Sequence, residues 1–388
     1  MPALTIPMSH RSQVVTPFMA MEVMERAKTL EASGRDVIYL CLGEPDFPTP
    51  EPIVEAVHAA VSRGETSYTH SLGRLDLREE IVAHYRQRYG VSISPEQVLV
   101  SSGTSPLMLL LFAALLENGD EIILPDPSYA CYPNFITFFG GRPRYLETRP
   151  EDAFQPTPRA VREALTERTR GVLINSPSNP AGSVMPADWQ REMAELSVPV
   201  IADEIYHGLT YEGEERSILE FTPDAFVLGG FSKTYAMTGW RLGYLISPSQ
   251  VARTLQSLHQ NFLISANNFV QVAGIAALRE CGTHVARMRQ EYDRRRRHLL
   301  SRLPELGLKV VRAPVAAFYV LADARHITDN SQALALQLLE ETGVALTPGS
   351  DFGPAGEGFL RFSYANSIDN LDRAVEKLKG YFVDQGWL

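Results

Sequence analysis

The sequence predicts an α/β protein: a large domain with a mostly parallel sheet flanked by helices, joined to a smaller α+β domain. Between about 98 and 228, short β-branched runs alternate with helical stretches, which is the pattern of a parallel sheet with helical crossovers. The C-terminal part instead carries longer helical stretches with few strands. A length of 388 residues is enough for two domains of ordinary size.

Each predicted strand of the large domain is a short run dominated by apolar residues, as expected for a strand that is buried on both faces. These runs are Val98–Val100, Glu121–Leu124, Gly171–Ile174, Val198–Ala202 and Ala225–Leu228. Helices are predicted between them, at about 106–117, 129–139, 157–167 and 186–196. Ligands bind beyond the carboxyl ends of the strands in sheets of this kind, so we expect a site there.

The small domain is predicted from elements nearer the C-terminus: a charged helix near 284–302, a strand at Ala316–Leu321, and helices near 331–342 and 369–383. The N-terminal segment is expected to join it, with Pro17 opening a helix that runs to about Ala32. We therefore place the large domain at 45–283 and the small domain at 1–44 plus 284–388. The basic run Arg294–Arg297 has acidic neighbours and is predicted to be a solvated helix face.

Composition argues against several classes of protein. Hydrophobic residues make up 45% and charged residues 21%, the balance of a packed globular protein. A net charge of −10 argues against a nucleic-acid partner. Three cysteines without CxxC spacing predict no disulfide framework, no metal site and a reducing, cytoplasmic compartment. A membrane span needs about 20 apolar residues, and the longest run, Leu107–Leu116, is much shorter, so no membrane association is expected.

A lysine and an arginine follow the last predicted strand. A lone loop lysine is usually a surface charge, but Lys233 stands at a strand end between Ser232 and Thr234, with aromatic residues nearby. An amine used in Schiff-base chemistry must be partly deprotonated, which a half-buried pocket with a nearby cation favours. Arg241 is expected to provide that cation and to bind a phosphate dianion through its planar guanidinium.

The stretch Ser101–Pro106 follows the first strand and precedes the apolar helix. Pro106 fits the first helical position, with Ser105 as the N-cap. The free N–H groups and the dipole of a helix start favour an anion, and Gly103 lets that anion approach the backbone. Ordinary helix capping is the alternative, and a P-loop is excluded because the GxxxxGK[ST] motif is absent.

Three further residues follow the intervening strands: Tyr129, Asn179 and Asp203. The tyrosine is either a packing residue or a plate that stacks on a planar ring, and the asparagine lies in a turn-forming stretch. The aspartate is either a helix cap or a carboxylate aimed at a pyridine nitrogen, which would keep that nitrogen protonated and make the ring an electron sink. Together with the lysine, the arginine and the anion cradle, these groups match the needs of one phosphate-bearing pyridine cofactor.

The chain resembles the class I aminotransferases, which are fold-type I enzymes that depend on pyridoxal 5′-phosphate, and especially their subgroup of thermophilic aspartate and broad-range aminotransferases. The likeness covers nearly the whole chain. The segments that carry it are Gly43–Pro50, Tyr68 with Gly73 and Leu77–Arg78, Asn179–Gly182, Asp203–Tyr206, Ser232–Arg241 and Arg361–Ala365. The lysine segment is the most specific of them.

The resemblance implies how the ring of the cofactor is held. Lys233 would bind the cofactor covalently and move the proton at the substrate α-carbon, and Asp203 would pair with the pyridine nitrogen. Tyr206 and Asn179 would bond the phenolic oxygen of the ring. Tyr129 would stack on the ring.

The resemblance also implies contacts with two anionic groups. The cofactor phosphate would be held by Gly103, Thr104 and Arg241, and by the partner subunit's Tyr68 in a homodimer. The substrate α-carboxylate would be bound by Arg361, expected at the end of the strand Gly358–Leu360, with help from the N–H of Gly43 and from Asn179. Many relatives carry a phosphate-binding serine three residues before the lysine. Here that residue is Gly230, so the bond is lost or is made by Ser232.

These roles imply a ping-pong aminotransferase that moves an amino group from an L-amino acid to a 2-oxo acid, with 2-oxoglutarate as the expected acceptor. No second arginine or lysine for a distal carboxylate is evident, so a dicarboxylate, aromatic or aliphatic preference stays open. The same residues would serve a C–S β-lyase or an enzyme like aminocyclopropane-carboxylate synthase. A cofactor-binding regulator without turnover is the third alternative; regulators of this fold carry a DNA-binding domain, for which the stretch before Gly43 is expected to be too short.

Overall fold

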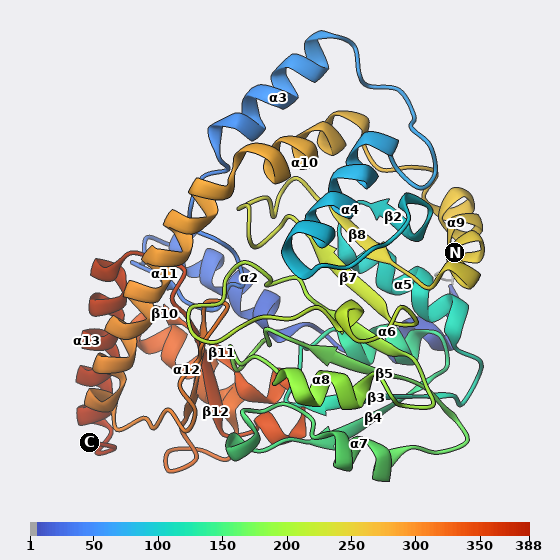
Figure 1. Ribbon diagram of the computed structural model, residues 1–388. Helices are drawn as coiled ribbons and strands as arrows, with labels where there is room; N and C mark the ends of the chain where they lie inside the picture. Colours follow the sequence, from blue (N-terminus) through green and yellow to red (C-terminus); the bar gives the residue numbers. More distant parts are fainter. Residues whose placement is uncertain (1–5) are drawn as a thin grey trace, which may run out of the picture.

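A seven-stranded sheet forms the centre of the computed structural model, which describes residues 6–388 (Figure 1). The strand order is β2–β8–β7–β6–β5–β3–β4, and every neighbouring pair is parallel except the two that involve β8. The strands are β2 Val98–Ser101, β3 Glu121–Asp126, β4 Arg142–Glu147, β5 Thr169–Asn175, β6 Val200–Asp203, β7 Phe226–Gly230 and β8 Gly243–Ile246. The predicted α/β class with a mostly parallel sheet is confirmed.

Alternate residues of each strand enter two different hydrophobic cores, which explains why the strands read as apolar runs. Val172 and Ile174 of β5 pack in one core, whereas Leu173 packs in the other. The first core contains residues of α3 Glu51–Ser62, α4 Leu75–Tyr89, α7 Pro158–Ala164, α8 Ala187–Met193 and α10 Asn268–Glu280. The second contains residues of α5 Thr104–Leu115, α6 Tyr132–Phe138 and α9 Ser249–Phe262.

A second body is built on two smaller sheets. Its strands are β9 Tyr319–Asp323, β11 Thr347–Pro348 and β12 Phe359–Ser363, which are antiparallel, and the parallel pair β1 Ile38–Tyr39 with β10 Val344–Ala345. Its helices are α2 Met19–Ala32, α11 Gly282–Arg302, α12 Ser331–Thr342 and α13 Ile368–Asp384. None of the helices among the described residues is both long and apolar enough to cross a bilayer.

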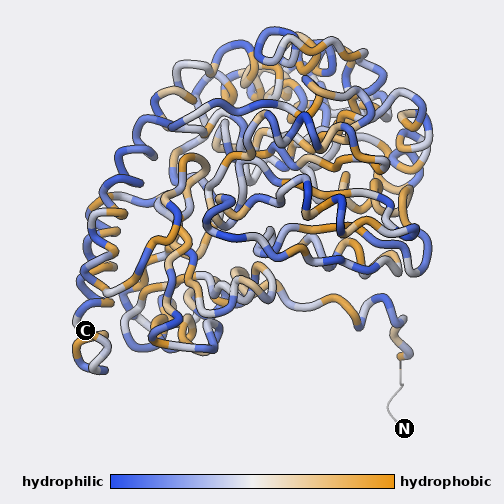
Figure 2. Tube along the Cα trace, turned by 60° about the horizontal axis from the view of Figure 1, so that its bottom comes forward, coloured by the Kyte–Doolittle hydropathy of each residue, from blue (hydrophilic) through white to orange (hydrophobic). Residues whose placement is uncertain are grey.

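Residues 6–18, including the short helix α1 His10–Gln13, form an arm on the outside of the molecule (Figure 2). The Thr16 N–H and hydroxyl donate to Oδ1 of Asn134, at 3.0 and 3.1 Å, which ties the arm to α6. The domain boundaries at 44/45 and 283/284 stay predictions. Residues 1–5 of the predicted small domain lie outside the described residues, and the second boundary falls in the first turn of α11.

Several boundaries differ from those predicted. The strand expected at Ala316–Leu321 is β9, displaced toward the C-terminus, and the helix expected from about 129 begins at Tyr132. Two strands of the large sheet were not predicted. β4 is an edge strand whose charged, half-exposed residues do not read as an apolar run, and β8 is only four residues long.

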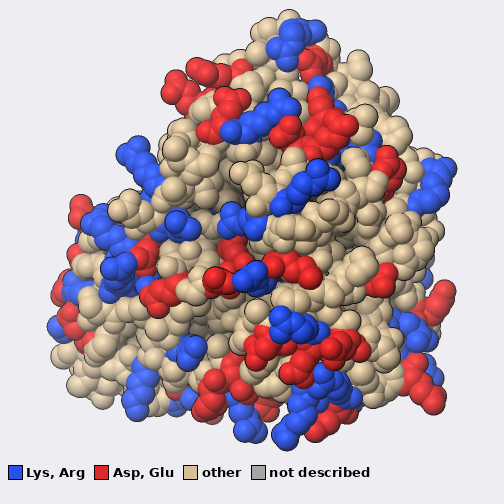
Figure 3. All heavy atoms as spheres, viewed as in Figure 1, with Lys and Arg blue, Asp and Glu red and all other residues tan. Residues whose placement is uncertain are grey.

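The prediction that Arg294–Arg297 form a solvated helix face is wrong for its two central residues. Four consecutive helical residues point in every direction around the axis, so Arg295 and Arg296 face inward. Arg296 is buried and donates to the Pro314 carbonyl at 2.6 Å and to Asp293 at 2.7 Å. Elsewhere, on the face drawn in Figure 3, acidic and basic side chains are intermixed.

Replacing Arg296 by methionine should therefore lower the free energy of unfolding by about 2 kcal/mol, because the buried Pro314 carbonyl loses its donor. Arg297→Met is the matched control on the next residue. Its side chain is exposed, so its loss should cost less than about 0.5 kcal/mol. Urea unfolding followed by circular dichroism measures both values, and equal losses would contradict the buried role of Arg296.

Candidate active site

A cavity of about 380 Å³ lies where the carboxyl ends of β5, β6 and β7 meet the second body. Residues that are far apart in the sequence converge on it, as expected for the edge of a parallel sheet. The predicted site residues in its wall are Gly43, Thr104, Tyr129, Asn179, Asp203, Tyr206, Ser232, Lys233, Arg241 and Arg361. Among the described residues, no group of histidine, cysteine, aspartate and glutamate side chains is arranged to hold a metal ion.

Lys233 follows β7, and its amine is directed into this cavity. Its Nζ donates to the carbonyl oxygen of Gly43 at 2.6 Å, so this contact joins the strand end of the large sheet to the segment that follows β1. Burial lowers the pKa of the Lys233 ammonium to about 8. The cations Arg241 and Arg361 contribute to this lowering, whereas the carboxylates Glu44 and Asp203 oppose it.

Asp203 is the last residue of β6 and is buried. Its Oδ2 accepts a hydrogen bond from the Tyr132 hydroxyl at 2.7 Å, and its Oδ1 accepts the Ile205 N–H at 3.2 Å. Burial raises the pKa of Asp203 to about 6, although the tyrosine bond acts in the opposite direction. The helix-cap alternative does not hold, because no α-helix begins among the residues directly after β6.

Arg361 lies in the middle of β12, not at the end of a strand as predicted. The side chain is 2% exposed, and its guanidinium lies over the Tyr319 ring with 4.4 Å to the ring centroid. Nη1 donates to Oδ1 of Asn179 at 2.9 Å, and Nη2 donates to the Cys41 carbonyl at 2.5 Å. Nη2 also donates to the Thr347 hydroxyl at 3.0 Å. Nε is buried without a hydrogen-bond partner, so two of the five N–H donors, one on Nε and one on Nη1, have no acceptor.

The aromatic residues of the site form two groups. The Tyr206 and Tyr319 hydroxyls are 2.8 Å apart. Tyr129 is half-buried and meets Tyr132 edge-to-face at 5.2 Å between ring centroids, and it meets Phe18 in the same way at 5.9 Å. These two near-perpendicular contacts fix the orientation of the Tyr129 ring by packing.

The helix start near Gly103 differs from the prediction. Gly103 is the N-cap, at φ +92°, and α5 begins at Thr104, so Ser105 is not the cap and Pro106 is not the first helical residue. The first-turn N–H groups have no acceptor within a helix, so a proline is tolerated at the third position as well. No side chain caps this end.

An arginine lies against the open helix start. A Cβ on Gly103 would lie 2.8 Å from Nη2 of Arg241, so only glycine admits the guanidinium at this distance. Arg241 is exposed in the single chain and donates from Nη1 to the Thr238 carbonyl at 3.1 Å. Uncapped N–H groups beside a guanidinium form an anion cradle.

Tyr68 stands apart from the other predicted residues. Its side chain is 81% exposed and is not in the cavity wall. Sequence reasoning also missed three residues that hold the site together: Tyr132, Asn175 and Tyr319. The sequence offered a clue for Tyr132 alone. It lies three residues after Tyr129, where the chain leaves β3 and enters α6, so it could be expected near the same sheet edge.

Comparisons with known proteins agree over nearly the full length. The profile of the family Aminotransferase class I and II matches residues 35–378. The (5-formylfuran-3-yl)methyl phosphate transaminase of Methanocaldococcus jannaschii is 38% identical over 369 residues, which are 94% of this chain and 96% of that protein. The aspartate/prephenate aminotransferase of Thermus thermophilus is 39% identical over 378 residues, 95% of this chain and 97% of that protein. The solved structure of Thermus thermophilus aspartate aminotransferase with maleate superposes with a TM-score of 0.93 at 38% identity, covering 97% of this chain and all of that one.

The lowered pKa of Lys233 predicts a pH-dependent stability of the cofactor-free protein. At pH 7 the folded protein holds a charged amine that burial disfavours, so Lys233→Met should raise the free energy of unfolding by about 2 kcal/mol. Between pH 8 and 10.5 the unfolded chain binds more protons than the folded one. The wild type therefore gains stability with rising pH, and the difference between the two proteins should shrink over this window.

Denaturant unfolding from pH 7 to 10.5 measures the difference. The control is Lys28→Met, because Lys28 is exposed on α2 and its replacement should shift stability only by a small amount. A gain for Lys233→Met that does not change with pH would mean that packing, not charge, is responsible.

Proposed function

This chain belongs to the class I and II aminotransferase family, and from that premise we propose that it moves an amino group from an L-amino acid to a 2-oxo acid by a ping-pong mechanism. We propose 2-oxoglutarate as the acceptor. The family implies dependence on pyridoxal 5′-phosphate and amino-acid and 2-oxo-acid substrates. Homologues named as aminotransferases favour this activity over a lyase on the same scaffold.

One observation carries the proposal: an amine with a lowered pKa, a buried carboxylate and a buried guanidinium face the same cavity. These are Lys233, Asp203 and Arg361. An amine that titrates near pH 8 is available as a nucleophile and a base under ordinary conditions. A guanidinium that lines the cavity and keeps N–H donors without an acceptor suits the carboxylate that every amino acid and 2-oxo acid carries.

The residues present fit the expected cofactor. The open start of α5 with Gly103, Thr104 and Arg241 would hold its phosphate, with Ser232 close by, because this is the anion cradle of the cavity. Asp203 would pair with the pyridine nitrogen, and Tyr129 would cover the ring. Asn179 and Tyr206 would bond the phenolic oxygen. When bound, pyridoxal 5′-phosphate supplies an electron-poor ring that stabilises charge at the substrate α-carbon.

Different residues of the chain then have different roles in the reaction. Arg361 binds the substrate carboxylate, and the Gly43 N–H assists it. Lys233 would remove the proton from the α-carbon, because a pKa of about 8 leaves part of its amine uncharged near neutral pH. Asp203 would keep a proton on the pyridine nitrogen. Its carboxylate is oriented for this by the Tyr132 hydroxyl.

We also propose that the enzyme is a homodimer in which the partner subunit's Tyr68 reaches the phosphate. The side chain of Tyr68 is highly exposed and is absent from the cavity wall of its own chain, and both observations support the proposal. An exposed tyrosine on a single chain is available to a neighbour.

A half-reaction panel tests the function. Each L-amino acid that is a substrate, added to the cofactor-loaded enzyme without an acceptor, should change the cofactor absorbance once, stoichiometrically, and 2-oxoglutarate should reverse the change. The ammonia released should be negligible, because the amino group stays on the cofactor. Continuous release of ammonia and pyruvate without an acceptor would identify a lyase, and no response to any amino acid would refute the proposal.

Arg361→Lys tests the carboxylate contact. A point charge cannot reproduce the planar guanidinium, so kcat/KM should fall at least about a hundredfold for every amino acid and 2-oxo acid, roughly 2.7 kcal/mol. Amines without a carboxylate should lose far less. Arg325→Lys is the control, because Arg325 is exposed near β9 and pairs with Asp323. Equal losses for amino acids and simple amines would assign Arg361 to the fold instead.

A further inference from the structure

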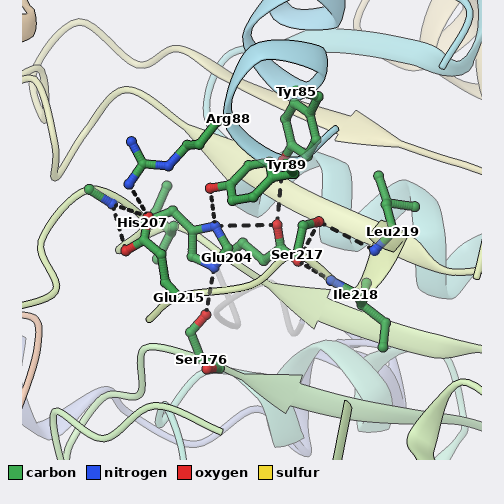
Figure 4. Close-up of polar contacts among 12 residues, drawn as sticks. Tyr85, Arg88, Tyr89, Ser176, Glu204, His207, Glu215, Ser217, Ile218 and Leu219 are labelled. Atoms are coloured by element: carbon green, nitrogen blue, oxygen red, sulfur yellow. Dashed lines mark hydrogen bonds and ion pairs between the residues drawn. The ribbon is translucent and has the colours of Figure 1, made fainter. Parts of the chain in front are cut away.

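A second group of buried polar residues lies directly behind the active cavity. Residues Asp203–Gly208 leave β6 as a turn, and their side chains point to two sides. Asp203 and Tyr206 line the active cavity, whereas Glu204 and His207 line a separate cavity of about 460 Å³ beside α4 and the start of α11. Figure 4 shows this second group, in which His207 lies at the centre.

The His207 imidazole makes a hydrogen bond with each ring nitrogen. Nε2 is 3.1 Å from the Ser176 carbonyl oxygen, and Nδ1 is 2.6 Å from the Tyr89 hydroxyl. A carbonyl oxygen can only accept, so Nε2 must carry the proton. In the neutral ring, Nδ1 then accepts from the tyrosine, which fixes both the tautomer and the plane of the ring.

The bond to Ser176 reaches the segment that carries Asn179. Asn175 holds both sides of this junction, because its Nδ2 donates to the Asp203 carbonyl at 2.9 Å and its Oδ1 accepts the Asn179 N–H at 2.8 Å. Asn179 in turn accepts from Arg361 at 2.9 Å. The imidazole thus links the turn behind Asp203 to the residues that orient the buried guanidinium.

The backbone of His207 also holds the lysine segment. The Thr234 hydroxyl donates to the His207 carbonyl at 2.5 Å, one residue after Lys233. Glu204 attaches the turn to another segment of the chain. It accepts from the Ser217 hydroxyl and the Ile218 N–H, both at 3.0 Å. In this group, the His207 imidazole is the side chain that connects the turn to the Ser176 segment.

We propose that His207 is a positioning residue for amino transfer, which sets the Asp203–Tyr206 turn against the Asn175–Asn179 segment through its Nε2–H. The inference rests on the proposed function. His207 touches neither substrate nor cofactor and acts through the groups that do. Its contribution is the alignment of the ring-binding residues with the carboxylate-binding residue.

Two amide replacements separate positioning from packing. In His207→Gln the side-chain amide nitrogen stands near the place of Nε2 and can still donate to the Ser176 carbonyl. In His207→Asn the amide nitrogen stands near the place of Nδ1 and cannot. Each variant keeps one of the two bonds of the imidazole: glutamine can keep the bond to Ser176, and asparagine can keep the bond to Tyr89. A larger loss in His207→Asn than in His207→Gln therefore assigns the effect to the Ser176 bond. His84→Asn is the control, because the His84 ring lines the same cavity, edge-on to Tyr85 and Tyr89.

The measurements are kcat and KM for amino transfer, the dissociation constant of pyridoxal 5′-phosphate titrated into each apoenzyme, and the melting temperature. We expect His207→Asn to lower kcat about tenfold and to weaken cofactor binding about threefold, as the loss of one buried hydrogen bond would. His207→Gln should retain kcat within about threefold, and His84→Asn within about twofold.

Equal kcat values for the two amides would overturn the inference, and so would a loss in His207→Asn that follows only from a smaller folded fraction. The wild-type enzyme in the same assay distinguishes a failure of the proposed function from a failure of the positioning role. If it transfers no amino group, the proposed function fails. The cofactor dissociation constants still test the positioning role.

Discussion

The arrangement of the cavity depends on the amine of Lys233, which is poorly solvated by water. Lys233 is placed by the end of β7, and its proton is accepted by the carbonyl of Gly43, which comes from the segment after β1. Burial and two nearby cations disfavour its charge, whereas Glu44 and Asp203 favour it. A reactive lysine therefore requires both bodies of the molecule in contact and a balanced set of charges around one cavity.

That contact between the bodies is made by buried polar bonds as well as by apolar packing. Arg361, in the middle of β12, donates to Asn179, in the segment that follows β5 of the large sheet, and to the Cys41 carbonyl. Arg295 of α11 donates to Asp46 at 2.8 Å. Because buried guanidinium groups need partners in fixed directions, these bonds specify one relative placement where apolar packing alone would tolerate several.

Much of the fold and of the site could be predicted, and the failures have physical reasons. Strands buried on both faces can be predicted because they are apolar runs in the sequence, as in Gly171–Ile174. The edge strand β4 carries charged residues and cannot be predicted in this way. Lys233, Asp203 and Arg361 stand in motifs that indicate the family, which the comparisons confirm. Tyr132 and His207 were missed because their hydrogen-bond partners cannot be identified from the sequence. Tyr132 meets Asp203 and His207 meets Ser176 only in the folded chain. The helix start at Thr104 was misplaced because proline fits more than one first-turn position.

The antiparallel strand β8 has a consequence for how this chain can vary. Lys233 and Arg241 lie on the connection between β7 and β8, whose register pairs Gly230 with Gly243. Gly243 also packs closely on the backbone of Gly103 and Thr104. The connection is therefore closed at both ends by the sheet, and its length sets the span between the Lys233 amine and the anion cradle at Arg241. An insertion at the exposed turn near Gly213 would leave this span unchanged, whereas a single insertion between Lys233 and Arg241 would change the size of the molecule that fits between the two groups.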